Sequence, residues 1–78
     1  MKSTFTREYG AFLEGLIAAR KRQELTQQTV ADLLGKPQSF VSKYESGERR
    51  LDVIEFIHLA KVLGDDPIRL LREMDLIQ

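Results

Sequence analysis

Apolar residues recur at steps of three and four positions along the first part of the chain. They are Phe5, Tyr9, Phe12, Leu13, Leu16 and Ile17. This spacing gathers the apolar side chains on one face of a helix, which we predict over about residues 7–23. Thr6 is suited to cap its first turn, and Glu8 is favourable there because its charge faces the positive end of the helix dipole. The pattern therefore predicts a long amphipathic helix at the start of the chain.

A short second helix is predicted after a break at residues 25 and 26. Thr26 is a suitable N-cap residue, and Gly35 is suited to end the helix because glycine adopts the left-handed backbone conformation at low cost. The apolar residues of this helix, all expected to face inward, are Val30, Leu33 and Leu34. Ala31 is small enough to let the following helix approach closely.

A third helix is predicted over about residues 38–45. Pro37 disfavours helical backbone at the residue before it but fits the beginning of the next helix. Val41 and Tyr44, three positions apart, should face inward. Two short helices joined by a tight turn that contains glycine describe a helix-turn-helix, here over about residues 27–46.

The last part of the chain predicts two further helices. Asp52 and Glu55 have the spacing of a capping box, which opens a fourth helix that closes at Gly64. The core-facing residues expected in this helix are Val53, Phe56, Leu59, Ala60 and Leu63. Asp66 and Pro67 open a shorter fifth helix. Its apolar residues are Ile68, Leu70, Leu71 and Met74. Since no Asn-Gly or Asp-Gly pair joins alternating segments, the predicted fold class is all-α.

Composition limits the classes of protein that remain. Seventy-eight residues, 42% of them hydrophobic, suffice for one small domain, which we expect to span residues 1–78. The absence of cysteine excludes disulfides, thiolate zinc sites and a cysteine nucleophile. No stretch is apolar enough for a signal peptide or a membrane span. We therefore expect a soluble, cytoplasmic protein without a membrane partner.

The charges are distributed unevenly along the chain. Twelve basic and twelve acidic residues give a net charge of zero, which by itself argues against nucleic acid as a partner. Residues 1–50 nevertheless hold nine bases and six acids, for a net charge of +3, and residues 51–78 hold three bases and six acids, for −3. Such asymmetry can mark a nucleic-acid-binding face, although ordinary solvated helix surfaces would also account for it.

The stretch LTQQTVADLLGKPQSFVSKYESGERR, residues 25–50, resembles the Cro and phage-repressor class of DNA-binding domains, the XRE family. The residues that match the family pattern are Leu25, Thr26, Gln27, Val30, Ala31, Leu34, Gly35, Val41, Ser42, Tyr44, Glu45 and Gly47. The resemblance extends over about residues 10–72 and includes LAKVLG at residues 59–64. The chain departs from the pattern at Lys36, Leu51 and Asp65. The resemblance implies a compact five-helix, lambda-repressor-like fold and a sequence-specific, DNA-binding transcriptional regulator of bacterial or phage type.

The resemblance also implies that the third helix lies in the major groove of double-stranded DNA. The residues expected to contact bases are Gln38, Ser39, Ser42 and Lys43, which share the surface opposite the inward-facing pair. The Gln38 amide can pair with adenine, and Lys43 can donate to guanine. The alternatives are that Gln38 and Ser39 are ordinary polar residues of a first turn and that Lys43 is a solvated lysine.

Four further residues are expected to contact DNA phosphates. They are Gln27 at the start of the second helix, and Lys36, Arg49 and Arg50 at the flanks of the groove-facing surface. The alternative for the two arginines is an exposed charge cluster that Glu48 neutralises locally. Phe40 has two open interpretations, because its ring could pack against neighbouring helices or contact a thymine methyl group or a sugar.

Arg20 and Glu45 match family positions that form a structural ion pair, and we expect them to connect the first helix to the third. The only histidine, His58, lacks the cysteine, second histidine or carboxylate set that a metal site needs, so we expect a surface histidine and no metal. No Walker loop, G-x-S-x-G or H-E-x-x-H motif occurs, so neither an enzyme nor a cofactor is expected.

One helix-turn-helix reads about half of an operator, so we expect a homodimer on a palindromic site with half-sites ~34 Å apart or a multiple of this. The C-terminal region, about residues 52–78, should hold the dimer together. The expected interface residues are Ile54, His58, Val62, Ile68, Leu71 and Met74. The alternative is that these residues complete the small core. The contrasting function is a protein-interaction module, such as an antitoxin that masks a partner protein with its apolar C-terminal segment.

Overall fold

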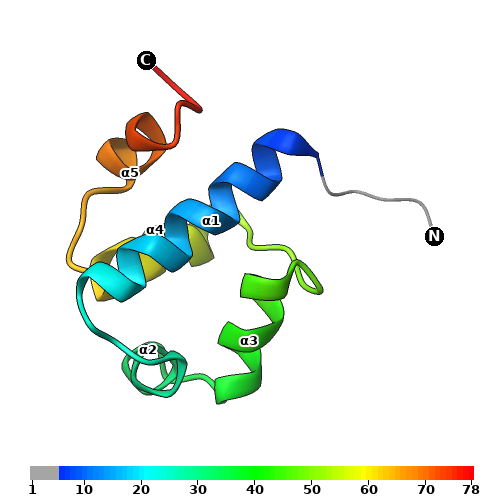
Figure 1. Cartoon of the computed structure of the whole chain (residues 1–78). Helices are drawn as coiled ribbons and strands as arrows, with labels where there is room; N and C mark the ends of the chain where they lie inside the picture. Colours follow the sequence, from blue (N-terminus) through cyan, green and yellow to red (C-terminus); the bar gives the residue numbers. More distant parts are fainter. Residues whose placement is uncertain (1–5) are drawn as a thin grey trace.

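The computed structural model describes residues 6–78, which form five α-helices and no β-strand (Figure 1). The helices are α1 (Arg7–Arg22), α2 (Gln27–Leu34), α3 (Gln38–Ser46), α4 (Val53–Val62) and α5 (Pro67–Glu73). The predicted all-α class and all five predicted helices are confirmed. Phe5, which belongs to the predicted apolar stripe of the first helix, lies outside the described residues.

Local side-chain chemistry sets where most of the helices begin. The Tyr9 backbone N–H donates to Thr6 Oγ1 at 3.0 Å at the start of α1. At the start of α4, the capping box is complete, because the Glu55 N–H donates to Asp52 Oδ1 (2.8 Å) and the Asp52 N–H donates to Glu55 Oε1 (3.0 Å). Helix α3 differs from the others, since its N-cap residue is Pro37 and no side chain caps it.

Buried residues from all five helices form one hydrophobic core. Its members are Leu13, Leu16, Ala19, Val30, Ala31, Val41, Tyr44, Phe56, Leu59, Ala60, Leu63 and Leu70. Helix α3 packs against α1 and α2, and α5 packs against α1 and α4. The core therefore holds α2 and α3 in a fixed orientation while leaving the outer side of α3 exposed (Figure 1).

Two residues that were predicted to face inward are exposed. Leu33 is 60% exposed, because the buried face of α2 is centred between Val30 and Ala31 and Leu33 lies to one side of it. Val53 is 70% exposed, because it occupies the first turn of α4, beside the face that Phe56 and the following core residues bury. Both predictions were wrong because the neighbouring helices cover a narrower face of α2 and of α4 than the apolar residues suggested.

Two close contacts connect α1 to later parts of the chain. In the middle of α1, a Cβ atom at Gly15 would lie 2.5 Å from Met74 Cε and 2.6 Å from Met74 Cγ, so glycine allows the segment after α5 to pack directly on α1. Near the start of α1, the Leu51 N–H donates to Tyr9 Oη at 3.2 Å. No helix within residues 6–78 has the length and apolar character needed to cross a membrane.

Candidate nucleic-acid interface

A turn of three residues, from Gly35 to Pro37, joins α2 to α3. Gly35 has φ +71°, the left-handed conformation, and an added Cβ there would meet no atom within 4 Å. The glycine is therefore needed for its backbone conformation and not for space. The Lys36 N–H donates to the Ala31 carbonyl at 2.9 Å, which closes the C-terminal end of α2. These contacts fix the angle at which α3 leaves the turn.

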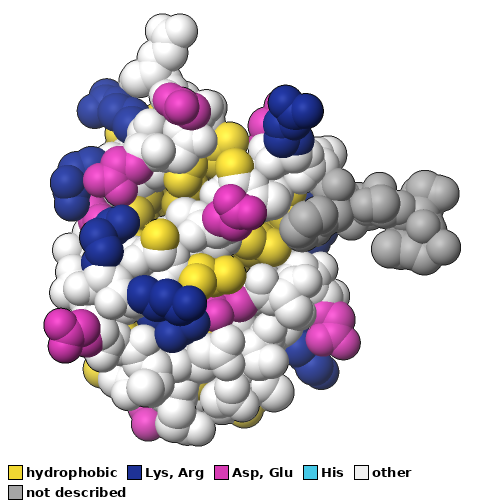
Figure 2. All heavy atoms as spheres, viewed as in Figure 1, with side chains coloured by type: hydrophobic (Ala, Val, Ile, Leu, Met, Phe, Trp, Pro, Cys, Tyr) yellow, Lys and Arg dark blue, Asp and Glu magenta, His cyan; other side chains and the backbone are white. Residues whose placement is uncertain are grey.

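The outer face of α3 carries the four residues that the sequence assigned to base contacts. Gln38, Ser39 and Lys43 are exposed and Ser42 is half-buried, whereas Val41 and Tyr44 are buried on the opposite face. In the space-filling view, few charged or hydrophobic side chains are visible on the part of the molecule formed by α2 and α3 (Figure 2). The structure therefore brings these four side chains together on one accessible helix surface.

A chain of hydrogen bonds links the first residues of α2 and α3. Gln38 Nε2 donates to Gln27 Oε1 at 2.7 Å, and Gln27 Nε2 donates to Glu45 Oε1 at 2.8 Å. Each Gln Nε2 carries two hydrogens, so one N–H of each amide remains for another acceptor. The amide of Gln38 is consequently held in a defined orientation at the N-terminal end of α3.

The ion pair expected between Arg20 and Glu45 is present and has two hydrogen bonds. Arg20 Nε lies 2.7 Å from Glu45 Oε2, and Arg20 Nη2 lies 3.0 Å from Glu45 Oε1. Arg20 Nη1 also donates to the Leu25 carbonyl at 3.0 Å. The hydrogen bond that Arg20 donates to Glu45 raises the pKa of Arg20 above its usual value, against the opposing effect of burial. The pair thus connects α1, the segment before α2 and the end of α3.

Tyr44, next to this ion pair, has a buried hydroxyl group for which the described residues provide no hydrogen-bond partner. Burial raises the pKa of Tyr44 well above its usual value, so the hydroxyl stays protonated. Leaving such a group without a partner costs about 1–3 kcal/mol.

We therefore predict that Tyr44→Phe leaves the free energy of unfolding unchanged or raises it by about 1 kcal/mol, because the ring is kept and the unpartnered hydroxyl is removed. Urea unfolding of the two proteins followed by circular dichroism would measure the difference. A loss of more than about 1 kcal/mol would show that the hydroxyl makes a stabilising bond.

Phe40 packs within the protein. Its ring is half-buried against the core and lies edge-on to Tyr44, with the ring centroids 5.7 Å apart. Two cations lie over the ring: Lys36 Nζ is 5.4 Å and Arg49 Cζ is 4.8 Å from its centroid. Of the two interpretations that the sequence left open, the structure therefore supports packing for Phe40.

Arg49 is held by Glu55, a contact that sequence reasoning missed. Arg49 Nη1 and Nη2 lie 3.0 and 2.8 Å from the two carboxylate oxygens of Glu55, and Nη1 also donates to the Arg50 carbonyl at 2.8 Å. These hydrogen bonds lower the pKa of Glu55 and raise that of Arg49. The charge of Arg49 is therefore locally neutralised, as one interpretation expected, but by Glu55 and not by Glu48. The sequence indicated that Glu55 belongs to a capping box, but it gave no indication of the pair with Arg49.

Arg50 and Lys36 occupy the two flanks of α3. Arg50 Cζ lies 4.1 Å from the centroid of the Tyr9 ring, so its guanidinium group is held against α1. Lys36 is exposed in the turn before α3. Among the four residues assigned to phosphate contacts, Arg49 and Gln27 are thus bonded to other side chains, and Lys36 and Arg50 lie over aromatic rings.

The six residues assigned to a dimer interface fall into two groups. Ile54 and Ile68 are 60% and 48% exposed, and His58 is also exposed. The others are half-buried and pack against the core, and they are Val62, Leu71 and Met74. Within residues 6–78, no group of three histidine, aspartate or glutamate residues is arranged to hold a metal ion.

Two short helices joined by a glycine turn, with an uncapped second helix that exposes amide, hydroxyl and ammonium groups, define a helix-turn-helix of the DNA-binding type. The helix-turn-helix model HTH_3 matches residues 16–66, more than half of the chain. The chain therefore belongs to this family of Cro and phage-repressor type helix-turn-helix proteins, the XRE family.

A solved structure supports the same assignment. An XRE-family like protein from Pseudomonas syringae pv. tomato str. DC3000 is 48% identical, with a TM-score of 0.83, and the match covers 87% of this chain and 83% of that chain. No match was found among curated proteins. The family is regulatory and non-enzymatic, so the protein is a DNA-binding helix-turn-helix regulator and not an enzyme.

Proposed function

We propose that this chain is a sequence-specific transcriptional regulator that binds a palindromic operator as a homodimer, with α3 in the major groove. The observation that carries the proposal is the orientation of Gln38 by Gln27 at the exposed N-terminal end of α3. Gln38 uses one N–H for that bond, so its Oε1 and second N–H can pair with N6 and N7 of an adenine. Lys43 would donate to a guanine, and Ser39 and Ser42 would contact bases or phosphates.

Residues around α3 would make the contacts with the DNA backbone. Lys36 and Arg50 would contribute most of the phosphate attraction, with the second N–H of Gln27 donating to a phosphate near the start of α2. Arg49 would contribute less, because the Glu55 carboxylate offsets its charge. Because the net charge of the protein is zero, attraction to DNA of any sequence should be weak and base contacts should carry much of the recognition.

A salt titration separates this function from the alternative of an antitoxin that masks a partner protein through an apolar surface. If the complex neutralises ~4 to 8 phosphates, the association constant for DNA should fall steeply as the salt concentration rises. Fluorescence anisotropy with a labelled duplex at several salt concentrations would measure the slope. A slope near zero, with binding still observed, would contradict a DNA-binding interface made of Lys36, Arg50 and their neighbours.

We further propose that the C-terminal region, residues 52–78, forms the dimer, with Ile54 and Ile68 as its most exposed apolar contacts and His58, Val62, Leu71 and Met74 beside them. Apolar side chains that are about half exposed in a small regulator are suited to an isologous contact between two copies. Such a dimer would act in the cytoplasm of a bacterium, on chromosomal or phage DNA.

We predict that Ile54→Asp yields a monomer at concentrations at which the original protein is a dimer, because the introduced carboxylate would be desolvated in the interface. The fold should survive, since Ile54 is 60% exposed. Sedimentation equilibrium would measure the association. Leu33→Asp is the matched control, because Leu33 is also 60% exposed but lies on α2, outside residues 52–78. A monomeric original protein, or a dimeric Ile54→Asp variant, would rule out this interface.

A further inference from the structure

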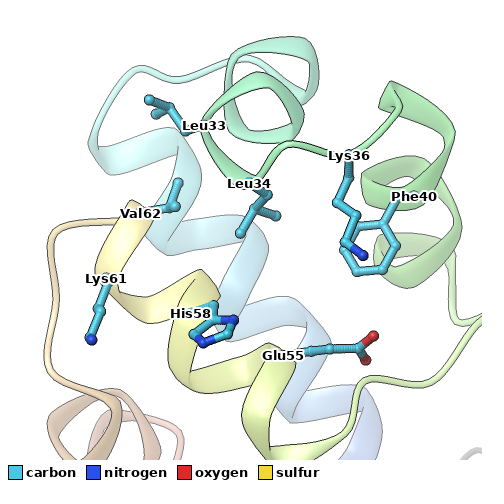
Figure 3. Close-up of a pocket in the computed structure, with 8 residues that line it drawn as sticks. All are labelled: Leu33, Leu34, Lys36, Phe40, Glu55, His58, Lys61 and Val62. Atoms are coloured by element: carbon cyan, nitrogen blue, oxygen red, sulfur yellow. The ribbon is translucent and has the colours of Figure 1, made fainter.

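An apolar groove lies between the end of α2, the start of α3 and one face of α4 (Figure 3). Its volume is about 330 Å³. Leu34, Phe40 and Val62 supply apolar surface from the three helices, and Leu33 stands 60% exposed at its edge. The groove does not include the four residues that we assign to base contacts. It therefore differs from the proposed base-contacting surface and lies on the flank of the helix-turn-helix.

Basic side chains border this groove. Lys36 lies on the α3 side and Lys61 on the far side of α4, with His58 between them (Figure 3). Glu55 is the one acid among the lining residues, and Arg49 pairs with its carboxylate at 2.8 Å. None of the ion pairs within residues 6–78 involves either lysine. The groove thus combines an apolar floor with two lysines at its margins.

We propose that this groove binds an amphipathic helix of a partner protein, with apolar residues against Leu34, Phe40 and Val62 and acidic residues facing Lys36 and Lys61. Charge complementarity selects the acidic partner, because opposite charges across an interface favour one partner over others. The described residues contain no strand edge to which an extended peptide could add, so a helix in a groove is the recognition mode that this all-α surface offers.

Two other occupants fit the groove less well. A second copy of the chain, placed on the same face by a two-fold axis, would bring its own Lys36 and Lys61 toward the same two lysines, and like charges across an interface are unfavourable. A small molecule would be poorly enclosed, since Leu33 is largely exposed at the edge and small-molecule sites bury most of the ligand surface.

The groove shares residues with two other surfaces, which gives its occupant a regulatory effect. Lys36 is among the residues proposed to contact phosphate, and His58 and Val62 belong to the proposed dimer surface. An acidic helix in the groove would occupy Lys36 and add negative charge near the DNA backbone, so it should weaken DNA binding. This effect on DNA rests on the proposed function, whereas binding of the helix does not.

The test uses a synthetic amphipathic peptide of about 14 residues, long enough to form a marginal helix, with leucines on one face and glutamates on both flanks. A control peptide carries lysine in place of each glutamate. Titration of each peptide into the ¹⁵N-labelled protein without DNA should shift backbone amides around the groove, and the glutamate peptide should bind about tenfold more tightly.

Variants of the protein make the test specific to the groove. Lys36→Glu combined with Lys61→Glu should reverse the preference, so that the lysine peptide binds more tightly. Lys21→Glu, an exposed change on α1, should leave the preference as it is. Leu33→Ser should weaken both peptides, while Ile77→Ser, at another exposed apolar position, should not. All of these positions except Lys36 lie outside the proposed DNA-binding residues.

Three results would overturn the proposal. They are amide shifts confined to another surface, equal affinity for the two peptides, and no shift at a peptide concentration of about 1 mM. A fourth result would also overturn it: shifts at Leu33, Leu34 and Phe40, which lie outside the proposed dimer surface, that depend on protein concentration without peptide would indicate a second copy as the occupant. If the protein binds DNA but not the peptide, only the proposal about the groove is refuted. If it binds the peptide but not DNA, only the proposed function is refuted.

Discussion

Gln38→Ala is expected to weaken binding to the cognate operator by about 1–3 kcal/mol and to relax the preference for one base pair. The reason is that Gln27 holds the Gln38 amide at the exposed end of α3, where it can satisfy the donor and acceptor of an adenine together. Affinities for the cognate duplex and for duplexes altered at one base pair would measure both effects. Lys43→Ala should give a loss of similar size at a different base pair.

Arg50→Ala is the matched control for this prediction. Because Arg50 is assigned to phosphate and its guanidinium lies against Tyr9, its loss should weaken binding to all sequences by a similar factor. The cognate and altered duplexes would then keep their relative affinities. If Gln38→Ala and Lys43→Ala instead reduced binding to cognate and random DNA equally, the assignment of α3 as the base-reading element would be wrong.

Removing one member of the ion pair between Arg20 and Glu45 is expected to destabilise the fold by about 3–5 kcal/mol, because the remaining charge loses its partner in a largely buried site. The two side chains are only 12% and 6% exposed, so water cannot replace the lost contact fully. Arg20→Met and Glu45→Gln, examined by urea unfolding, would measure the effect. Glu45→Gln is the milder change, since its amide can keep a bond to Gln27 or Arg20.

The double variant decides whether the loss arises from the pair itself. If Arg20 and Glu45 act on each other, the combined substitution should cost clearly less than the sum of the two single losses. A coupling energy near zero would contradict a structural ion pair. Destabilisation by the single variants should be accompanied by weaker recognition of the operator, because Glu45 also accepts the hydrogen bond that positions Gln27.

Local features made the helices predictable from the sequence. Thr6, Thr26 and Asp52 cap the helices that they were predicted to cap, and Gly35 has the left-handed conformation expected at the turn. Each of these features depends on residues within a few positions of one another. The outward face of α3 was predictable for the same reason, since helical periodicity alone separates Gln38 and its neighbours from the buried pair.

Features that depend on distant parts of the chain were harder to predict. Helical spacing placed Leu33 and Val53 near a core face, but only the positions of the other helices determine how far that face extends. The bond between Gln38 and Gln27 and the pair formed by Arg49 and Glu55 join residues without a shared periodic pattern. The Arg20 and Glu45 pair was predicted because the family resemblance supplied it.

Recognition of a specific DNA sequence by α3 can be measured by selecting binding sites from a pool of random duplexes. We expect enrichment of a palindromic site whose half-sites are ~34 Å apart or a multiple of this, and loss of the enriched sequence with Gln38→Ala. A pool that shows no enrichment over random sequence, while the protein remains folded, would contradict this expectation.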